Sequence, residues 1–252
     1  MSTPAKPDSK NSKVIDADIY KHAAKEGNDE SMPPAIPAAT VTLLRDTDNG
    51  IEVLMLRKNP EIGFGGMWVF PGGRIDPEDY PENGNKKQAA RTAAAREASE
   101  EAGIQIDSDQ FIQFSQWTPP PLTQKRFETS FFAVHAPDGL DINIDGEEIH
   151  DHQWINPAEA IRLRDAGKID LVAPTWVTLY TLSKHATVDA LLTHLDSTPV
   201  GVYQTHADKS GATDRIVMWA GDAGYESWDG SVQGARHRLT MTNDRFIFED
   251  TF

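Results

Sequence analysis

The chain has 252 residues, no cysteine and a formal net charge of −15. Without cysteine there are no disulfides and no cysteine-ligated metal sites, which suits the reducing cytoplasm where we expect the protein. The negative charge repels phosphate backbones and acidic lipids, so we expect neither nucleic acid nor a membrane as a partner. A small anionic substrate stays compatible with this charge, because bound cations reverse its local sign.

Three regions follow one another along the chain. Residues 1–35 are rich in Pro, Ser, Lys and Asp, a composition that predicts a disordered tail. Residues 36–198 show alternating strand and helix patterns and are predicted to form the main domain. Residues 199–252 show only short strand patterns, so we expect a small β-rich C-terminal extension there.

The elements predicted in the main domain describe a mixed sheet with helices outside it, in the α/β (α+β) class. A hairpin of strands 39–45 and 51–56 comes first, followed by a glycine-rich loop and turn. An alanine-rich helix is predicted at 87–102, and Gly103 is placed to end it. The later predictions are strands at 111–117, 128–136 and 153–155, and helices at 157–166 and 174–182. The extension has strand patterns at 200–205, 215–220, 236–242 and 245–249.

The helix predicted at 87–102 carries three glutamates on one face. Glu97, Glu100 and Glu101 occupy positions i, i+3 and i+4. By itself such a cluster is typical of a solvated acidic helix face. Here the other faces are mostly alanine, so the helix can pack closely, and a glycine turn precedes it. Three adjacent carboxylates repel one another unless a cation lies among them, and Mg²⁺ prefers such oxygen ligands.

A longer motif surrounds these glutamates. The segment from Arg96 to Ile104 reads Arg-Glu-Ala-Ser-Glu-Glu-Ala-Gly-Ile, and a Phe-Pro-Gly-Gly lead-in ends at Gly73. Together they resemble the Nudix box, G-x5-E-x7-R-E-U-x-E-E-x-G-U, in which U is aliphatic. The resemblance covers roughly residues 38–196 and implies a Nudix-type mixed β-sheet sandwiched between helices.

The first half of this box departs from the pattern. Between Gly73 and Arg96 lie 22 residues, nine more than the 13 of the pattern. Counted from Gly73 the first glutamate position falls on Asp79, and counted back from Arg96 it falls on Gln88. Asp76 or Asp79 could supply that carboxylate. An insertion here is similar to the Nudix branch that includes peroxisomal coenzyme A diphosphatases, which implies CoA or acyl-CoA as substrate.

The resemblance implies a metal-dependent hydrolase that cleaves the pyrophosphate bond of a nucleoside diphosphate derivative. Bound Mg²⁺ or Mn²⁺ would neutralise phosphate oxygens and activate the attacking water. The implied metal ligands are Glu97, Glu100 and Glu101, with Arg96 orienting Glu100 or its neighbour.

Further residues complete the predicted site. Nudix enzymes commonly use a later glutamate as base or extra ligand, and Glu148 is preferred here over Glu147. Arg57 and Arg126 are candidates to bind substrate phosphates, although each taken singly is compatible with a surface ion pair. Gly72 and Gly73 would shape the loop beside the ions.

Two other functions stay open at this point. The same mechanism could act on ADP-ribose or a dinucleotide, or the chain could be a non-catalytic Nudix-fold module that binds a nucleotide. The complete glutamate triad argues against the module, since a pure binder needs no full metal set. The partner expected in each case is a small nucleotide-type molecule, and Nudix proteins are often homodimers. Arg236 and Arg238 share a strand face and either reach substrate or pair with nearby acids.

Overall fold

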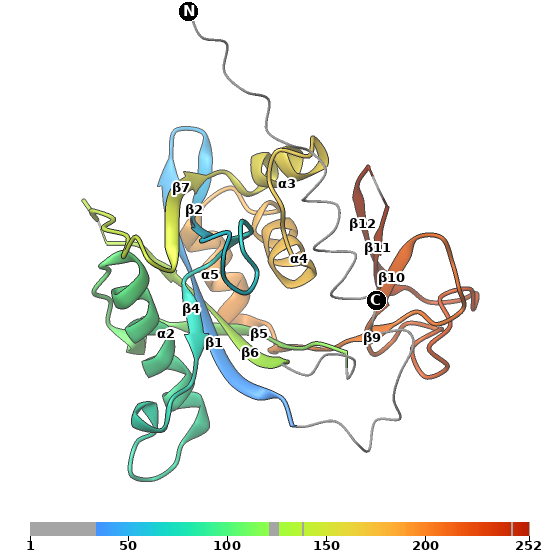
Figure 1. The fold of residues 1–252 in the computed structure, drawn as a ribbon, viewed down its shortest axis with the longest axis horizontal. Coiled ribbons are helices and arrows are strands. Elements are labelled where there is room, and N and C mark those ends of the chain that lie inside the picture. The colour runs from blue at the N-terminus through green and yellow to red at the C-terminus, as the bar shows by residue number, and fades with distance from the viewer. Residues whose placement is uncertain (1–33, 121–125, 138, 243, 252) are drawn as a thin grey trace, which may run out of the picture.

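The computed structural model describes residues 34–120, 126–137, 139–242 and 244–251. The tail predicted at residues 1–35 therefore lies, except for its last two residues, outside the described residues. The described part contains an eight-stranded mixed sheet and a four-stranded sheet (Figure 1). Helix α2 packs on one face of the larger sheet, and α3, α4 and α5 pack on the other. The predicted α+β class, with a mixed sheet between helices, is confirmed.

The elements of the larger sheet and its helices follow this order along the chain: β1 Ile36–Thr47, β2 Gly50–Lys58, β3 Trp68–Val69, β4 Gly72–Arg74, α2 Lys86–Ala102, β5 Ile112–Thr118, β6 Phe127–His135, β7 Ile149–Ile155, α3 Pro157–Asp165, α4 Ala173–Leu182, α5 Val188–Ser197 and β8 Gly201–Gln204. Two short 3₁₀ turns precede α2 and β5, at Pro77–Asp79 and Ser108–Gln110. The smaller sheet holds β9 His206–Ala207, β10 Arg215–Met218, β11 His237–Met241 and β12 Phe246–Asp250.

Strands β1 and β2 separate soon after their hairpin turn. They pair only over residues 44–47 and 50–53, whereas β6 accompanies β1 in parallel over residues 36–44. Beyond the hairpin, β4 pairs with β1 at residues 38–40 and β3 pairs with β2 at residues 56–57. The glycine turn predicted from the sequence thus fills the space between the two diverging strands.

Helix α2 lies against this region because its inner face is made of alanine. Ala90, Ala94 and Ala98 are buried against side chains of β1, β2 and β6. The helix begins after Asn85, whose side chain accepts the backbone N–H groups of Lys87 and Gln88. It ends at Gly103 in the left-handed conformation, with φ of 70°, as the sequence predicted. Small side chains bring the helix close to the sheet and its carboxylates close to the turn.

The C-terminal segment is divided between the two sheets. Strand β8 pairs in parallel with β5 at the edge of the larger sheet, and β9 to β12 form the separate antiparallel sheet. The two sheets share an aromatic core, in which the ring of Trp117 stacks on Tyr203 and meets Trp219 edge-on. Arg238 forms an ion pair with buried Asp222. Of the two roles predicted for Arg238, reaching substrate or pairing with a nearby acid, the structure shows the second.

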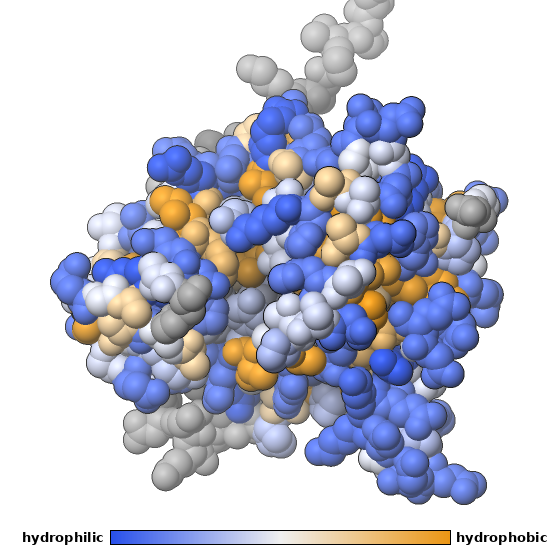
Figure 2. Space-filling view, turned by 180° about the vertical axis from the view of Figure 1, so that it is seen from behind, coloured by the Kyte–Doolittle hydropathy of each residue, from blue (hydrophilic) through white to orange (hydrophobic). Residues whose placement is uncertain are grey.

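The surface reflects the acidic, polar composition. The face in Figure 2 is mainly hydrophilic, and its hydrophobic residues lie in separate small groups. Within the described ranges, no helix combines the length and apolar character needed to cross a membrane.

Candidate functional site

The glycine turn makes direct contact with two of the glutamates on α2. The backbone N–H of Gly72 donates to Oε2 of Glu101 at 2.9 Å. A Cβ atom on Gly73 would lie 2.3 Å from Oε1 of Glu97, and one on Gly72 would lie 2.4 Å from the carbonyl oxygen of Ala39. Both positions therefore require glycine, because any side chain would push the turn away from the helix or from β1.

Arg96 connects the acids on either side of the insertion. Its Nε and Nη2 atoms donate to the carboxylate of Asp79 at 3.1 and 2.9 Å. Its Nη1 atom donates to Glu97 at 3.0 Å and to Glu100 at 2.9 Å. Asp79 is buried and also accepts the backbone N–H of Asp76 at 2.8 Å. Asp79, found by counting from Gly73, is thus the upstream carboxylate that Arg96 binds by hydrogen bonds, and the extra residues follow it. Asp76 lies 3.8 Å from the same guanidinium.

Glu101 is the most deeply buried of the site carboxylates. Its side chain is 3% exposed, and its Oε1 atom has no hydrogen-bond partner. Burial raises the pKa of Glu101 to about 8, against the lowering effects of the Lys58 charge and the Gly72 N–H. Burial is also the main cause that raises the pKa of Glu97, which its contact with Arg96 opposes. The charge of Glu148 raises both values further, so the three carboxylates interact electrostatically.

Lys58, at the end of β2, lies between Glu101 and Glu148. Its Nζ atom is 3.7 Å from Oε1 of Glu101 and also contacts Oε1 of Glu148. The loop before β7 holds Glu148 in place, because Asp145 accepts its backbone N–H at 3.0 Å. The Glu148 side chain is 47% exposed, so it faces solvent as well as the buried carboxylate.

The metal-free protein is expected to lose stability as the pH rises from about 5 to about 8. The pKa of Glu101 is about 8 in the folded chain against an ordinary value of 4.5, so the folded chain binds more protons in this window. Ionisation of Glu101 therefore favours the unfolded chain, and the stabilising effect of its proton is lost as the pH rises through the folded pKa. Urea unfolding in EDTA at several pH values measures the effect. Glu101→Gln should remove this contribution, and identical pH profiles for the two proteins would contradict the prediction.

The structure brings most of the predicted site residues together. Those that meet at the turn are Gly72, Gly73, Arg96, Glu97, Glu101 and Glu148. Glu100 precedes Glu101 on α2 and lies on the solvent side of the cluster. Its side chain is 58% exposed and pairs with Arg96. Glu147 contributes its backbone carbonyl to Asn59.

The two arginines predicted to bind phosphate lie away from this cluster. Arg57 is next to Lys58 but faces the opposite side of β2, near Asp170. Burial raises the pKa of Asp170, and the charges of Arg164 and Arg57 oppose this rise. The main chain of Arg126 bonds to Ile36. Ile36 is four residues along β1 from the Thr40–Gly72 pair, a separation of roughly 13 Å.

Lys58 is the residue that the sequence analysis missed. Leu54 and Leu56 face α2, and side chains alternate along a strand, so Lys58 comes next on that face. This alternation separates Lys58 from Arg57, but the position of α2 is needed to tell which of the two faces the carboxylates.

The residues at the turn fit a divalent cation. The buried Oε1 atom of Glu101 lacks a hydrogen-bond partner, and the carboxylates of Glu97 and Glu148 interact electrostatically with Glu101. Mg²⁺ and Mn²⁺ prefer carboxylate oxygens as ligands. In the part of the chain that is described, no three His, Asp or Glu side chains are already gathered as a metal site. Instead Lys58 and Arg96 hold the carboxylates.

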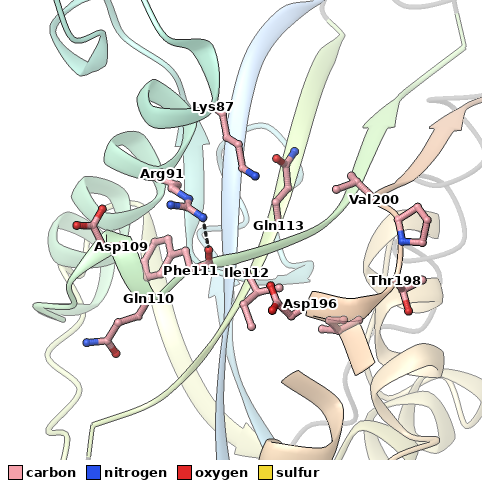
Figure 3. Close-up of a pocket in the computed structure, with 12 residues that line it drawn as sticks. Lys87, Arg91, Asp109, Gln110, Phe111, Ile112, Gln113, Asp196, Thr198 and Val200 are labelled. Atoms are coloured by element: carbon pink, nitrogen blue, oxygen red, sulfur yellow. Dashed lines mark hydrogen bonds between the residues drawn. The ribbon is translucent and has the colours of Figure 1, made fainter. Parts of the chain in front are cut away.

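A separate cavity of ≈ 330 Å³ lies between the start of α2, the start of β5 and the link from α5 to β8 (Figure 3). Arg91 donates there to the carbonyl oxygen of Phe111 at 2.8 Å. No predicted site residue lines this cavity. The carboxylate site is therefore located elsewhere on α2, at the glycine turn.

Comparisons with known proteins bear on the fold and on the family of the chain. The putative nudix hydrolase 7 of Caenorhabditis elegans is 26% identical over 183 residues, which is 58% of this chain and 60% of that protein. The chain thus matches less than two thirds of that relative's length. The crystal structure of a NUDIX hydrolase from Alicyclobacillus acidocaldarius has the same fold, with a TM-score of 0.58 and 21% identity over 67% of this chain and 100% of that one.

The family model described as the NUDIX domain matches residues 35–174, which is more than half of the chain. This range contains the glycine turn, α2 with its glutamates and the Glu148 loop. The chain belongs to the Nudix family.

Proposed function

We propose that this chain is a metal-dependent hydrolase that cleaves the pyrophosphate bond of a nucleoside diphosphate derivative, with CoA or acyl-CoA as its substrate. The observation that carries the proposal is the Glu101 carboxylate. It is buried, one of its oxygens has no hydrogen-bond partner, and it lies beside the glycine turn. The charged form of such a carboxylate is stable only beside positive charge, and a nucleotide hydrolase needs cations to bind phosphates.

In this proposal the metal ligands are Glu97, Glu100 and Glu101. When bound, Mg²⁺ or Mn²⁺ would neutralise phosphate oxygens and lower the pKa of a water molecule. Arg96 positions Glu97 and Glu100 by direct hydrogen bonds and is itself held by Asp79.

Two further parts of the site complete the proposed reaction. Glu148 is partly open to solvent and close to Glu101, so it can accept the proton of the attacking water as general base. Gly72 holds Glu101 through its backbone N–H, and Gly73 leaves room for the carboxylate of Glu97.

The choice of CoA rests on the insertion. The nine extra residues occur where the resembling Nudix branch has its own insertion, and they extend the loop after Asp79 and the first turns of α2. The observation that supports a hydrolase over a binding module is the geometry of Arg96. Its contacts hold two glutamates in fixed positions, which a protein that binds nucleotide without metal does not need.

A substrate panel tests the proposal. The full chain is incubated with CoA, acetyl-CoA, ADP-ribose, NADH or a diadenosine polyphosphate, in Mg²⁺, in Mn²⁺ and in EDTA, and products are identified by mass. We expect cleavage of CoA or acetyl-CoA at the pyrophosphate, only with metal, and with the largest kcat/KM of the panel. Preferred cleavage of ADP-ribose or a dinucleotide would refute the CoA assignment alone. Binding without any cleavage would refute the hydrolase assignment.

A further inference from the structure

Lys58 combines three properties that ordinary surface lysines lack. Its side chain is only 15% exposed. Its ammonium group contacts Glu148 and lies 3.7 Å from the unbonded oxygen of Glu101. It is also anchored at the base of a closed loop, because its backbone N–H and carbonyl bond to Met67 and Gly66. The ammonium group is therefore held where its charge acts on the most buried carboxylate of the site.

We infer that Lys58 is the built-in counter-ion of the metal site, and that its ammonium group must give way when a divalent cation binds. The inference rests on the proposed function, since it assumes that Glu101 is a metal ligand. In the metal-free chain, the charge of Lys58 favours the ionised form of Glu101, which is shielded from water, and keeps Glu148 beside it. Lys58 is thus a positioning residue for these two carboxylates.

The charge of Lys58 should have opposite effects on two measurable quantities, the stability of the metal-free fold and the affinity for a divalent cation. Lys58 lowers the free energy of the metal-free fold with Glu101 ionised, because a buried carboxylate without a partner is costly. The same positive charge repels an incoming divalent cation at a distance of a few ångströms. A partner that only supported the fold would not weaken metal binding, so tighter binding after its removal identifies the competition.

The test uses Lys58→Met in the full chain, because methionine keeps much of the side-chain length without the charge. After removal of metal with EDTA and dialysis, Mn²⁺ is titrated and free Mn²⁺ is followed by electron paramagnetic resonance. We expect the variant to bind Mn²⁺ about tenfold more tightly than wild type, as estimated for loss of one nearby charge in a partly buried site. We also expect its urea midpoint in EDTA to fall below that of wild type.

Lys86→Met is the matched control. It removes the same charge from an exposed position on α2, 15 residues before Glu101 and so roughly 22 Å away along the helix. We expect its Mn²⁺ affinity and its urea midpoint to equal those of wild type. An equal gain in affinity in both variants would show that only the net charge of the protein affects Mn²⁺ binding, and would overturn the inference. Unchanged or weaker Mn²⁺ binding by Lys58→Met would also overturn it.

Glu101→Gln separates this inference from the proposed function. If the metal site is correct, this variant loses most Mn²⁺ binding whatever Lys58 does. If wild type binds no Mn²⁺, or Glu101→Gln binds it as well as wild type, the proposed metal site fails and the role of Lys58 fails with it. If Glu101→Gln loses binding while Lys58→Met leaves affinity unchanged, only the role of Lys58 is refuted.

Discussion

Glu101→Gln is expected to lower the metal-dependent rate of pyrophosphate cleavage by about 100-fold or more. Glutamine keeps the shape of the side chain and can still accept the Gly72 N–H, but it lacks the charge that would hold a divalent cation. Charge neutralisation by a metal ion is worth several kcal/mol in such reactions, and each 1.36 kcal/mol corresponds to a factor of about ten. The measurement is kcat/KM at saturating Mg²⁺, on the substrate that the panel identifies.

The fold of this variant should remain intact, because the substitution removes a buried charge and no apolar contact. Near-UV circular dichroism and the urea midpoint in EDTA check this directly. Glu82→Gln is the matched control, since it makes the same chemical change at an exposed position in the loop before α2. A folded Glu101→Gln enzyme with the wild-type rate would remove Glu101 from the metal site.

Asp222→Ala is expected to lower the free energy of unfolding by roughly 3–5 kcal/mol, the usual cost of breaking a buried ion pair. The Asp222 side chain is 0% exposed and accepts hydrogen bonds from Arg238 at 2.5 and 2.6 Å. It also accepts the backbone N–H groups of Gly224 and His237. Burial alone would raise the pKa of Asp222, but these bonds outweigh it and the pKa is lowered. The substitution leaves the Arg238 guanidinium buried without its partner.

Urea unfolding at neutral pH measures this loss. The double variant Asp222→Leu with Arg238→Met should recover much of the stability, because it removes both charges and fills similar space. Glu159→Ala breaks a solvent-exposed pair with Arg162 and should leave the midpoint unchanged. If Asp222→Ala unfolds at the same midpoint as Glu159→Ala, the pair does not stabilise the second sheet.

Local patterns predicted the elements whose signals lie within a few residues. The α2 helix was predicted from its alanine and glutamate content, its end from Gly103, and both agree with the structure to within one residue. The hairpin and the strands at β5 and β6 were also found, since alternation and turn residues are local signals. Helix α5 lies in a stretch with no predicted element, although Val188, Leu191 and Leu195 form an apolar face there.

Pairing between distant strands decided what local patterns could not. β8 is the first strand of the predicted extension, yet it joins the larger sheet because its partner β5 lies more than 80 residues earlier. Strands β3 and β4 are only two and three residues long and exist because β1 and β2 diverge. No local signal distinguishes such short segments from a turn.

The sequence by itself determined the glutamates on one helical face, the glycine turn before them and the family they indicate, because helical spacing and residue type are local. The tertiary structure alone decided which upstream acid binds Arg96 by hydrogen bonds and which basic residue of β2 faces the carboxylates. Asp79 accepts two hydrogen bonds from Arg96, whereas Asp76 lies 3.8 Å from the same guanidinium. Lys58, and not Arg57, lies on the side of the sheet that α2 covers. Both choices depend on contacts between residues far apart in the chain. On a strand, moving by one residue also turns the side chain to the other face of the sheet.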